Sequence, residues 1–345
     1  MSTFEIPMNQ QTKFIWADHL RVAATIAVIT VHVSASILPL YKQIPDLTWW
    51  TGNLFDSVSR FCVPIFVMLS GALLLPKDTA LPQFFKKRLS RLIYPFLFWC
   101  VVYIVHYFLF YTKSIQTLSA NELYAQLVDQ IKYKVISYHF WYIYMIIGLY
   151  LAIPFMGKWI RKARESALLY FLGVWLVGLL LLENVGKGVE INHFIRYIGY
   201  LVLGYYLSRK EFSFNTAKVA LILIVTGILI TAVGTYILTS YYGKFNLFFY
   251  GYTSPNVILF ASGVFLYFKS LKINPDKKNK VITFINRYSY GIYLVHILIL
   301  THLKISWRTI HPLLGIPLTV VCCLLISSLV IYVINKIPGG KYISG

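Results

Sequence analysis

Three of the ionisable side chains in one apolar run near the N-terminus have a spacing that could serve chemistry. The run 14–38 contains Asp18, Arg21 and His32. In an α-helix, the eleven steps from Arg21 to His32 bring both side chains onto one face, about 16 Å apart along the axis. Asp18 lies three residues before Arg21, a spacing at which a carboxylate and a guanidinium can meet. Because a neutral imidazole is the usual base near pH 7, this face favours proton transfer at His32 within a polar interior. The alternative is an Asp18–Arg21 ion pair that reaches the membrane interface and a His32 that packs against a backbone partner.

A further guanidinium, Arg60, lies in the next apolar run, 53–75. It can stabilise negative charge that develops during a reaction, and it does so more strongly where water is excluded. The alternative is an ion pair with Asp56, four residues earlier. Pro64 predicts a kink in this helix.

A basic cluster, Lys86-Lys87-Arg88-Leu89-Ser90-Arg91, precedes the third apolar run. Arg88 and Arg91 are three residues apart, so both can face one way on a helix. Since guanidinium groups bind phosphate oxygens in pairs of hydrogen bonds, the two arginines predict an anion site suited to phosphates. An equally weighted alternative is a signal for membrane orientation that also attracts anionic lipid.

Ring-bearing side chains gather later in the chain, at His139, Trp141, Tyr293 and His296. Aromatic faces can stack on sugar rings, so these residues are candidates for binding a sugar substrate. The alternative is an interfacial aromatic belt with packed histidines. Arg196 lies within another apolar run.

The elements that must position these groups follow from composition. Of the 345 residues, 58% are hydrophobic and only 13% charged, about half the charge of a soluble domain. Most of the surface must therefore face lipid, and the fold class is an all-α polytopic membrane bundle. Runs near the 20 residues that cross a bilayer predict about ten transmembrane helices, at 14–38, 53–75, 92–111, 139–157, 167–182, 194–208, 216–240, 255–268, 282–303 and 312–334. They form one domain, 14–335, between an N-terminal tail, 1–13, and a C-terminal tail, 336–345.

Charge and cysteine usage narrow the class further. Lys and Arg are more than twice as frequent in the loops on the side of the termini as in the opposite loops, which predicts that both termini are cytoplasmic. The net charge of +20 belongs to these membrane flanks, so no nucleic-acid partner is expected. The four cysteines lie in apolar runs without CxxC spacing, so neither a disulfide framework nor a metal site is expected.

The order and spacing of these motifs resemble the membrane-bound acyltransferase family 3, over nearly the whole chain. The matching residues are Asp18-x-x-Arg21 with His32, Arg60 with Val63-Pro64-x-Phe66 and Ser70-Gly71, Arg88-x-x-Arg91 before Pro95, His139-x-Trp141, and Ser289-x-Gly291-Ile292-Tyr293-x-x-His296. Within the family, the chain looks most like the branch that contains the enterobacterial common antigen O-acetyltransferase. Phe66-Val67-Met68 departs from the paired phenylalanines that many members have.

The resemblance implies an O-acetyltransferase of the bacterial cytoplasmic (inner) membrane. Its partners would be acyl-CoA, with acetyl-CoA as the donor co-substrate and no metal, a glycan or lipid-linked sugar as acceptor, and membrane lipid. His32 would be the general base or, as an open variant, a covalent acyl carrier. Arg60 would steady the developing charge, Arg88 and Arg91 would hold the CoA phosphates, and the Asp18–Arg21 pair would shape the donor channel. His139, Trp141, Tyr293 and His296 would contact substrate. The alternative is a transporter or flippase for a polyprenyl-linked sugar or small solute, because charged residues and broken helices also mark transport paths.

Overall fold

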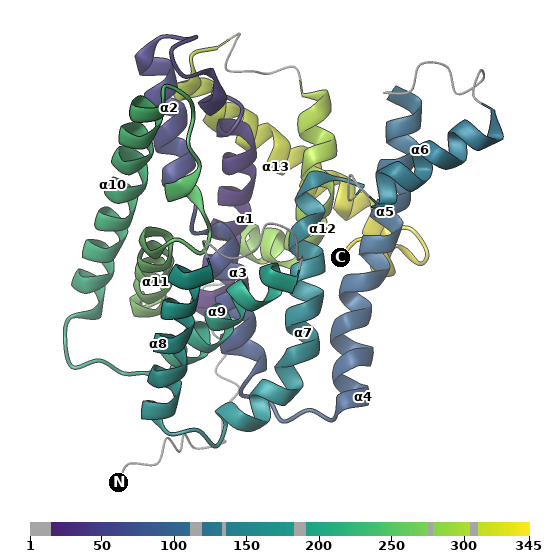
Figure 1. The fold of residues 1–345 in the computed structure, drawn as a ribbon. Coiled ribbons are helices and arrows are strands. Elements are labelled where there is room, and N and C mark those ends of the chain that lie inside the picture. Colours follow the sequence, from purple (N-terminus) through teal and green to yellow (C-terminus); the bar gives the residue numbers. More distant parts are fainter. Residues whose placement is uncertain (1–14, 111–118, 133–135, 183–190, 275–278, 304–309) are drawn as a thin grey trace.

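The computed structural model describes residues 15–110, 119–132, 136–182, 191–274, 279–303 and 310–345, and all regular structure in these ranges is helical. Figure 1 shows the helices arranged as one bundle. The N-terminal tail predicted for 1–13 lies outside the described residues. The all-α fold class is thus confirmed for the part of the chain that is described.

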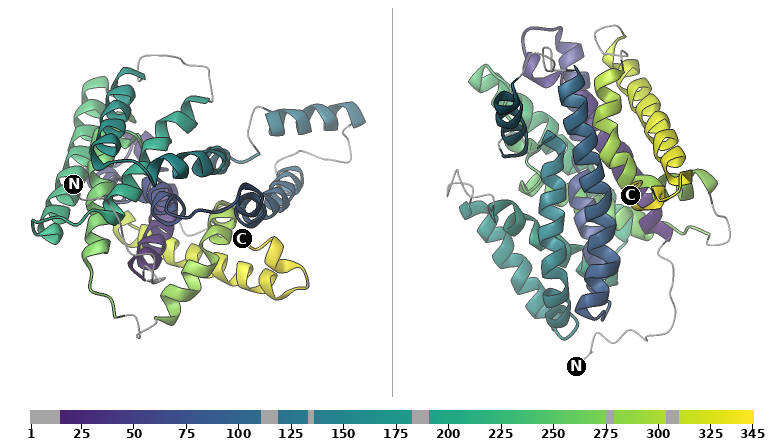
Figure 2. Two further views of the ribbon diagram at one scale, coloured as in Figure 1. Left: turned by 90° about the horizontal axis from the view of Figure 1, so that it is seen from below. Right: turned by 90° about the vertical axis from the view of Figure 1, so that its right-hand side faces the viewer.

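Two helices form the centre of the bundle. The helix α1 (Ile15–Ser34) packs on α3 (Cys62–Leu74), α12 (Lys280–His302) and α13 (Pro312–Lys336), and α3 packs closely on α9 (Ile191–Arg209). The remaining helices surround these: α2 (Asp46–Ser57), α4 (Leu81–Phe84), α5 (Ser90–Phe110), α7 (Trp141–Ile160), α8 (Glu165–Leu182), α10 (Thr216–Tyr242) and α11 (Pro255–Ser270). An amphipathic helix, α6 (Ala120–Lys132), projects away from the bundle (Figure 2).

Six helical segments of the described chain are long and apolar enough to cross a membrane. They are Ile15–Leu40, Asp46–Leu74, Leu81–Phe110, Tyr138–Ile160, Thr216–Tyr242 and Pro312–Lys336. Four other helices were predicted as spans but are not among these six. The helices α8 and α11 are too short, and α9 and α12 carry more polar and charged residues than the six segments do. A multi-pass arrangement is confirmed, whereas the predicted count of about ten spans is not.

The second predicted span is interrupted, and the interruption is not at Pro64. The helix α2 ends at Ser57, residues 58–61 form turns, and α3 begins at Cys62. Pro64 lies in the first turn of α3, where a missing N–H leaves no intrahelical hydrogen bond unmade. The predicted kink at Pro64 is therefore wrong, and the chain instead breaks at Arg60.

Two glycines allow the backbones of α3 and α9 to touch. A Cβ atom on Gly71 would lie 1.9 Å from the carbonyl oxygen of Leu201, and a Cβ on Gly204 would lie 2.1 Å from that of Met68. Small residues at such crossings permit the close packing that holds membrane helices together.

Adding one methyl group at this crossing should destabilise the protein. We expect Gly71→Ala and Gly204→Ala each to cost about 1–3 kcal/mol or more, because the clashing atoms belong to backbone that cannot rotate away. Thermal unfolding of the purified protein in detergent measures the effect. The matched control is Gly173→Ala in α8, where a Cβ would meet nothing within 4 Å. Equal melting temperatures for Gly71→Ala and Gly173→Ala would contradict the packing argument.

The segment that follows α13 packs onto the bundle. The Asn335 side-chain amide donates to the Ser344 hydroxyl at 2.7 Å, and the Trp99 indole N–H donates to the Ile343 carbonyl at 3.2 Å. Ser344 is fully buried. The tail was predicted for residues 336–345. Lys336 instead ends α13, and residues 337–345 are held between α5 and α13.

Candidate active site

His32 lies at the end of α1, among aromatic rings from two other helices. Its ring centroid is 5.1 Å from that of His296 in α12 and 5.4 Å from that of Tyr138, which precedes α7. The Tyr138 hydroxyl oxygen lies 3.3 Å from His32 Nδ1. His32 itself is half-buried. A partly accessible imidazole with an oriented ring has the arrangement that a general base requires.

Two further imidazoles next to His32 each present an unpaired nitrogen. His139 and His296 are buried, and their ring centroids are 5.3 Å apart. The Nδ1 atom of His296 is 2.6 Å from the Tyr293 carbonyl, and that of His139 is 2.8 Å from the Ser137 hydroxyl. The Nε2 atoms of both are buried without a hydrogen-bond partner. Because buried polar atoms are normally satisfied, these two nitrogens have hydrogen-bonding capacity that a polar ligand could use.

The three histidines do not amount to a metal site. Among the described His, Cys, Asp and Glu side chains, no group of three has the arrangement that could hold a metal ion. We call His32, His139 and His296 the histidine cluster.

Arg60 is buried and fixed in place by Asp56 and two tyrosines. The guanidinium forms an ion pair with Asp56, stacks over the Tyr250 ring with its carbon 4.3 Å from the ring centroid, and lies 5.5 Å from that of Tyr252. Its Nη1 donates to the Tyr250 carbonyl at 3.4 Å. The Ser34 hydroxyl, two residues after His32, donates to Asp56 at 3.4 Å. The ion pair proposed as the alternative is thus formed, and the same contacts hold the guanidinium beside the end of α1.

Removing the carboxylate of Asp56 should be costly. Asp56 is fully buried and Arg60 is 8% exposed, so Asp56→Ala leaves a buried charge unpaired, at a cost of about 3–5 kcal/mol. The matched control is Asp18→Ala. Asp18 lies 3.8 Å from Arg21, with side-chain exposures of 31% and 27%, and we expect a cost of about 0–1 kcal/mol there. Thermal unfolding distinguishes the two, and equal losses would contradict the assigned burial.

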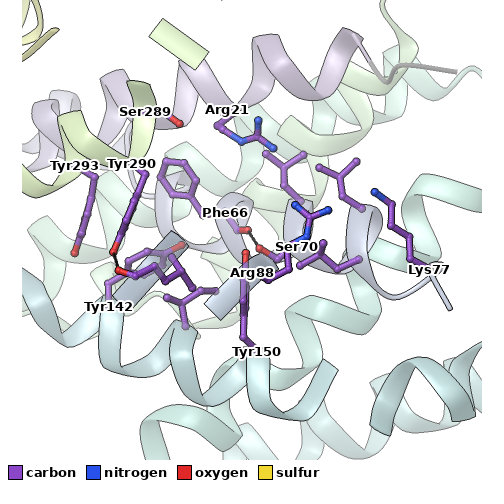
Figure 3. Close-up of a pocket in the computed structure, with 15 residues that line it drawn as sticks. Arg21, Phe66, Ser70, Lys77, Arg88, Tyr142, Tyr150, Ser289, Tyr290 and Tyr293 are labelled. Atoms are coloured by element: carbon purple, nitrogen blue, oxygen red, sulfur yellow. Dashed lines mark hydrogen bonds between the residues drawn. The ribbon is translucent and has the colours of Figure 1, made fainter. Parts of the chain in front are cut away.

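A cavity of about 290 Å³ lies between α1, α3, α5, α7 and α12. Tyr142, Tyr290 and Tyr293 lie toward one end of the cavity and Lys77 lies toward the other (Figure 3). Arg21, Arg88 and Tyr150 lie between them. The full lining is Arg21, Phe66, Leu69, Ser70, Leu73, Leu74, Lys77, Arg88, Leu92, Tyr142, Ile146, Tyr150, Ser289, Tyr290 and Tyr293. We call it the basic cavity.

Arg21 reaches this cavity from the face of α1 that also carries His32. Its Nη1 donates to the Asn286 side-chain oxygen of α12 at 2.7 Å. Ten residues further along α12, His296 lies against His32. Both ends of the predicted stripe therefore face the same helix, as the helical spacing predicts. Asp18 lies close to Arg21 but is not among the residues that line the cavity.

Arg88 lines the basic cavity, whereas Arg91 does not. Residues 85–89 form a π-helical turn directly before α5, with hydrogen bonds that span five residues. This wider turn changes the angular spacing, so the two arginines do not share the face expected for a regular helix. Arg91 is exposed. Such π turns occur often at functional sites.

Lys77 stands at the mouth of the basic cavity, close to Arg88. Desolvation and, next in size, the positive charge of Arg88 lower the pKa of Lys77. The nearby carboxylate Asp78 pairs instead with Arg161, at 2.7 Å. Within the described chain, neither Lys77 nor Arg88 forms an ion pair with a carboxylate. Two cations without a carboxylate between them form a site that an anion would stabilise.

The basic cavity ends one aromatic layer short of the histidine cluster. Tyr142 and Tyr293 line its inner end, with ring centroids 5.3 Å apart. The Tyr293 hydroxyl donates to the His139 carbonyl, and its ring centroid is 5.6 Å from that of His296. Trp141 lies apart from the cavity and stacks on Tyr252 at 6.0 Å. Of the four predicted substrate contacts, the structure thus brings together His139, Tyr293 and His296. Trp141 lies apart from them, against the Tyr252 ring that faces Arg60.

Four residues of this site were not predicted from the sequence: Lys77, Tyr138, Tyr142 and Asn286. The amide of Asn286 within an apolar helix was a usable signal, because polar groups inside spans face polar interiors. No comparable signal marks the tyrosines in a chain with 27 of them.

The helices and the cation-lined cavity define a multi-pass membrane protein with an internal site. The model of the acyltransferase 3 family, described as an acyltransferase domain, matches residues 14–334, and the chain belongs to this family. A search of the curated proteins found no match, and a search of the solved structures found none. The family predicted from the motifs is confirmed, and the chain is a membrane acyltransferase. The comparisons give no support to the transporter alternative.

Proposed function

We propose that this protein is an O-acetyltransferase that transfers the acetyl group of acetyl-CoA to a hydroxyl of a cell-envelope glycan or lipid-linked sugar. We place it in the bacterial cytoplasmic membrane with about ten crossings and both termini in the cytoplasm, in the branch that resembles the enterobacterial common antigen enzyme. The basic loops on the side of the termini support this orientation.

One observation carries the proposal: the basic cavity leads from a pair of cations to the edge of the histidine cluster. Lys77 and Arg88 suit the phosphates of CoA at the cytoplasmic mouth. The apolar and tyrosine-lined interior suits the thin pantetheine arm, with Arg21 beside it. The thioester then arrives next to Tyr293, whose ring touches His139 and His296. Tyr142 and Tyr293 must turn aside for the acetyl group to reach His32.

The chemistry follows from the orientation of His32. The Tyr138 hydroxyl lies 3.3 Å from Nδ1. In the tautomer whose Nδ1 carries the proton and donates it to this hydroxyl oxygen, Nε2 holds a lone pair that accepts the proton of the acceptor hydroxyl. The hydroxyl oxygen forms a bond to the thioester carbonyl carbon, and negative charge develops on the carbonyl oxygen. Arg60 stabilises that charge from a position fixed by Asp56. The carbon–sulfur bond then breaks, and the thiolate of CoA takes the proton from His32.

The alternative route, in which His32 carries the acetyl group, predicts a different result without acceptor. Incubation with donor labelled in the acetyl group would then leave label on the wild-type protein and none on His32→Ala. Direct transfer leaves both proteins unlabelled.

Mass spectrometry of envelope polysaccharide tests the proposed function. Cells that contain the protein should carry one more acetyl group per acceptor unit than cells without it, and cells with His32→Ala should match the latter. Identical spectra from all three would overturn the proposed acceptor class.

A further inference from the structure

A groove of about 120 Å³ lies between the loop 75–80, α4 and the last turns of α7. We call it the Lys158 groove, after the lysine that α7 contributes to it. Its lining shares Leu74 and Lys77 with the basic cavity, so the groove and the cavity are adjacent. Figure 3 shows Lys77 at the end of the basic cavity away from Tyr293. A ligand that leaves the basic cavity past Lys77 therefore reaches this groove.

The walls of the Lys158 groove are fixed by contacts within the protein. The Arg161 guanidinium, directly after α7, donates to the Lys77 carbonyl at 3.1 Å and to the Asp78 carboxylate at 2.7 Å. These bonds tie the loop 75–80 to the end of α7. Phe84 of α4 is 5% exposed, and its ring centroid lies 6.3 Å from that of Tyr150, which lines the basic cavity. The groove is thus preformed beside the cavity.

The Lys158 groove carries an excess of positive charge. Lys158 and Arg161 are three residues apart, and both line it. Asp78 is the one carboxylate among the described residues of the lining, and it pairs with Arg161. Within the part of the chain that the structure describes, neither Lys77 nor Lys158 forms an ion pair. Because a lysine ammonium is a common partner of phosphate, the two lysines suit a phosphate-bearing ligand.

The size of the basic cavity leaves the nucleotide of CoA outside it. The cavity has a volume of about 290 Å³, near the lower end for ligand sites, about 300 Å³. It can hold the thin pantetheine arm but not the adenosine as well. The groove beyond Lys77 offers what the adenosine needs, because Leu81 and Pro154 provide apolar surface for the ring and Lys158 provides a cation for the ribose phosphate.

We propose that the Lys158 groove binds the nucleotide end of the acyl donor, with the Lys158 ammonium on the 3′-phosphate of its ribose. This rests on the proposed function, because it takes CoA as the carrier of the acetyl group and this end of the bundle as the cytoplasmic one. It narrows the donor to a CoA thioester, since an acyl group on a carrier protein brings no nucleotide. An anionic phospholipid offers the same phosphate chemistry beside a membrane, and the experiment separates the two sources.

Binding of adenosine 3′,5′-bisphosphate to the purified full-length protein, in a neutral detergent, tests the inference. We expect Lys158→Gln to weaken this binding at least about tenfold, because a hydrogen bond to a charged group is lost. Adenosine 5′-monophosphate lacks the 3′-phosphate, so it should bind the wild type at least about tenfold more weakly and bind Lys158→Gln equally weakly. The control is Lys162→Gln. Lys162 is exposed and lines neither the groove nor the basic cavity, so this variant should bind the bisphosphate as the wild type does.

Turnover with a matched pair of donors gives a second measurement. Lys158→Gln should raise the KM for acetyl-CoA at least about tenfold and leave the KM for acetyl-dephospho-CoA, which lacks only the 3′-phosphate, at the wild-type value. Equal effects on both donors, or no effect on either, would overturn the inference. Because Lys158 is exposed, the variant should keep the wild-type melting temperature.

Competition identifies the occupant of the groove. Displacement of the bisphosphate by an equal concentration of phosphatidylglycerol would overturn the inference and assign the groove to a phospholipid head group. Displacement by an equal concentration of inorganic phosphate would also overturn it, because the adenosine would then contribute nothing. The binding measurement needs neither acetyl group nor acceptor. Acetyl transfer without nucleotide binding would therefore remove this inference alone, whereas nucleotide binding without acetyl transfer would contradict only the proposed reaction.

Discussion

Replacing His32 with alanine should lower the rate of acetyl transfer by at least about 100-fold, because a positioned base contributes 10²–10⁴-fold. His32 is the histidine of the cluster that is only half-buried, and it sits beside Tyr138 and His296 at the end of α1. The loss should appear in kcat, since the basic cavity, where the donor binds, is not lined by His32. Turnover of acetyl-CoA by purified protein with a saturating acceptor measures it.

A matched control lies on the same helix. The Nδ1 atom of His19 is 3.0 Å from the Ile15 carbonyl, one turn earlier in α1. His19→Ala should therefore retain turnover, and both variants should match the wild type in yield and melting temperature. Turnover near the wild-type rate in His32→Ala would remove His32 from the mechanism. Equal losses in both variants would indicate damage to α1 rather than lost chemistry.

The predictions that succeeded rest on regular helix geometry. The face shared by Arg21 and His32 could be predicted because α1 is an uninterrupted helix of 20 residues, so the angle between them follows from counting. The contact between Asp18 and Arg21 follows in the same way. The membrane class required only composition. In each case, the information lies within one element and needs no knowledge of its neighbours.

The predictions that failed depend on local departures from that geometry. The polar residues around the break, among them Ser59 and Arg60, were interpreted as side chains within one continuous span, so the break at Arg60 was not predicted. The π turn at 85–89 changed which arginine faces inward. Both departures lie at the candidate site, where strained or irregular backbone is most often retained.

A second cavity, which lies between α8, α9 and the loop before α11, could not be predicted from local sequence. One wall of this cavity is the loop before α11, and its position depends on where α11 begins alongside α10. Contacts between the two helices, such as the hydrogen bond from Asn256 to Thr231, set that position. Arg196 alone marks the place, as a charge within an apolar helix. The sequence shows that charge but not what surrounds it.

The contrast between Arg88 and Arg91 gives the second large expected effect. Arg88→Ala should raise the KM for acetyl-CoA by roughly 10–100-fold, the equivalent of the about 1.5–3 kcal/mol that a hydrogen bond to a charged group contributes. The kcat should change little, because Arg88 lies away from Tyr293, on the side of the cavity toward Lys77 (Figure 3). Arg91→Ala, which removes an exposed guanidinium off the cavity, should change the same KM by only a few-fold at most, since surface charges are screened by water and salt.

A truncated donor separates phosphate binding from general damage. The acetyl thioester of N-acetylcysteamine retains the reacting carbonyl and the end of the pantetheine arm but has no phosphate. If Arg88 holds the CoA phosphates, Arg88→Ala should lower kcat/KM for acetyl-CoA and leave kcat/KM for the truncated thioester unchanged. A parallel loss with both donors would mean that Arg88 supports the fold of the cavity instead. Arg88 and Arg91 carry the same charge and differ only in position, because the π turn directs Arg88 alone toward the cavity. Equal effects of Arg88→Ala and Arg91→Ala on the KM for acetyl-CoA would therefore mean that the cluster acts only through its overall charge.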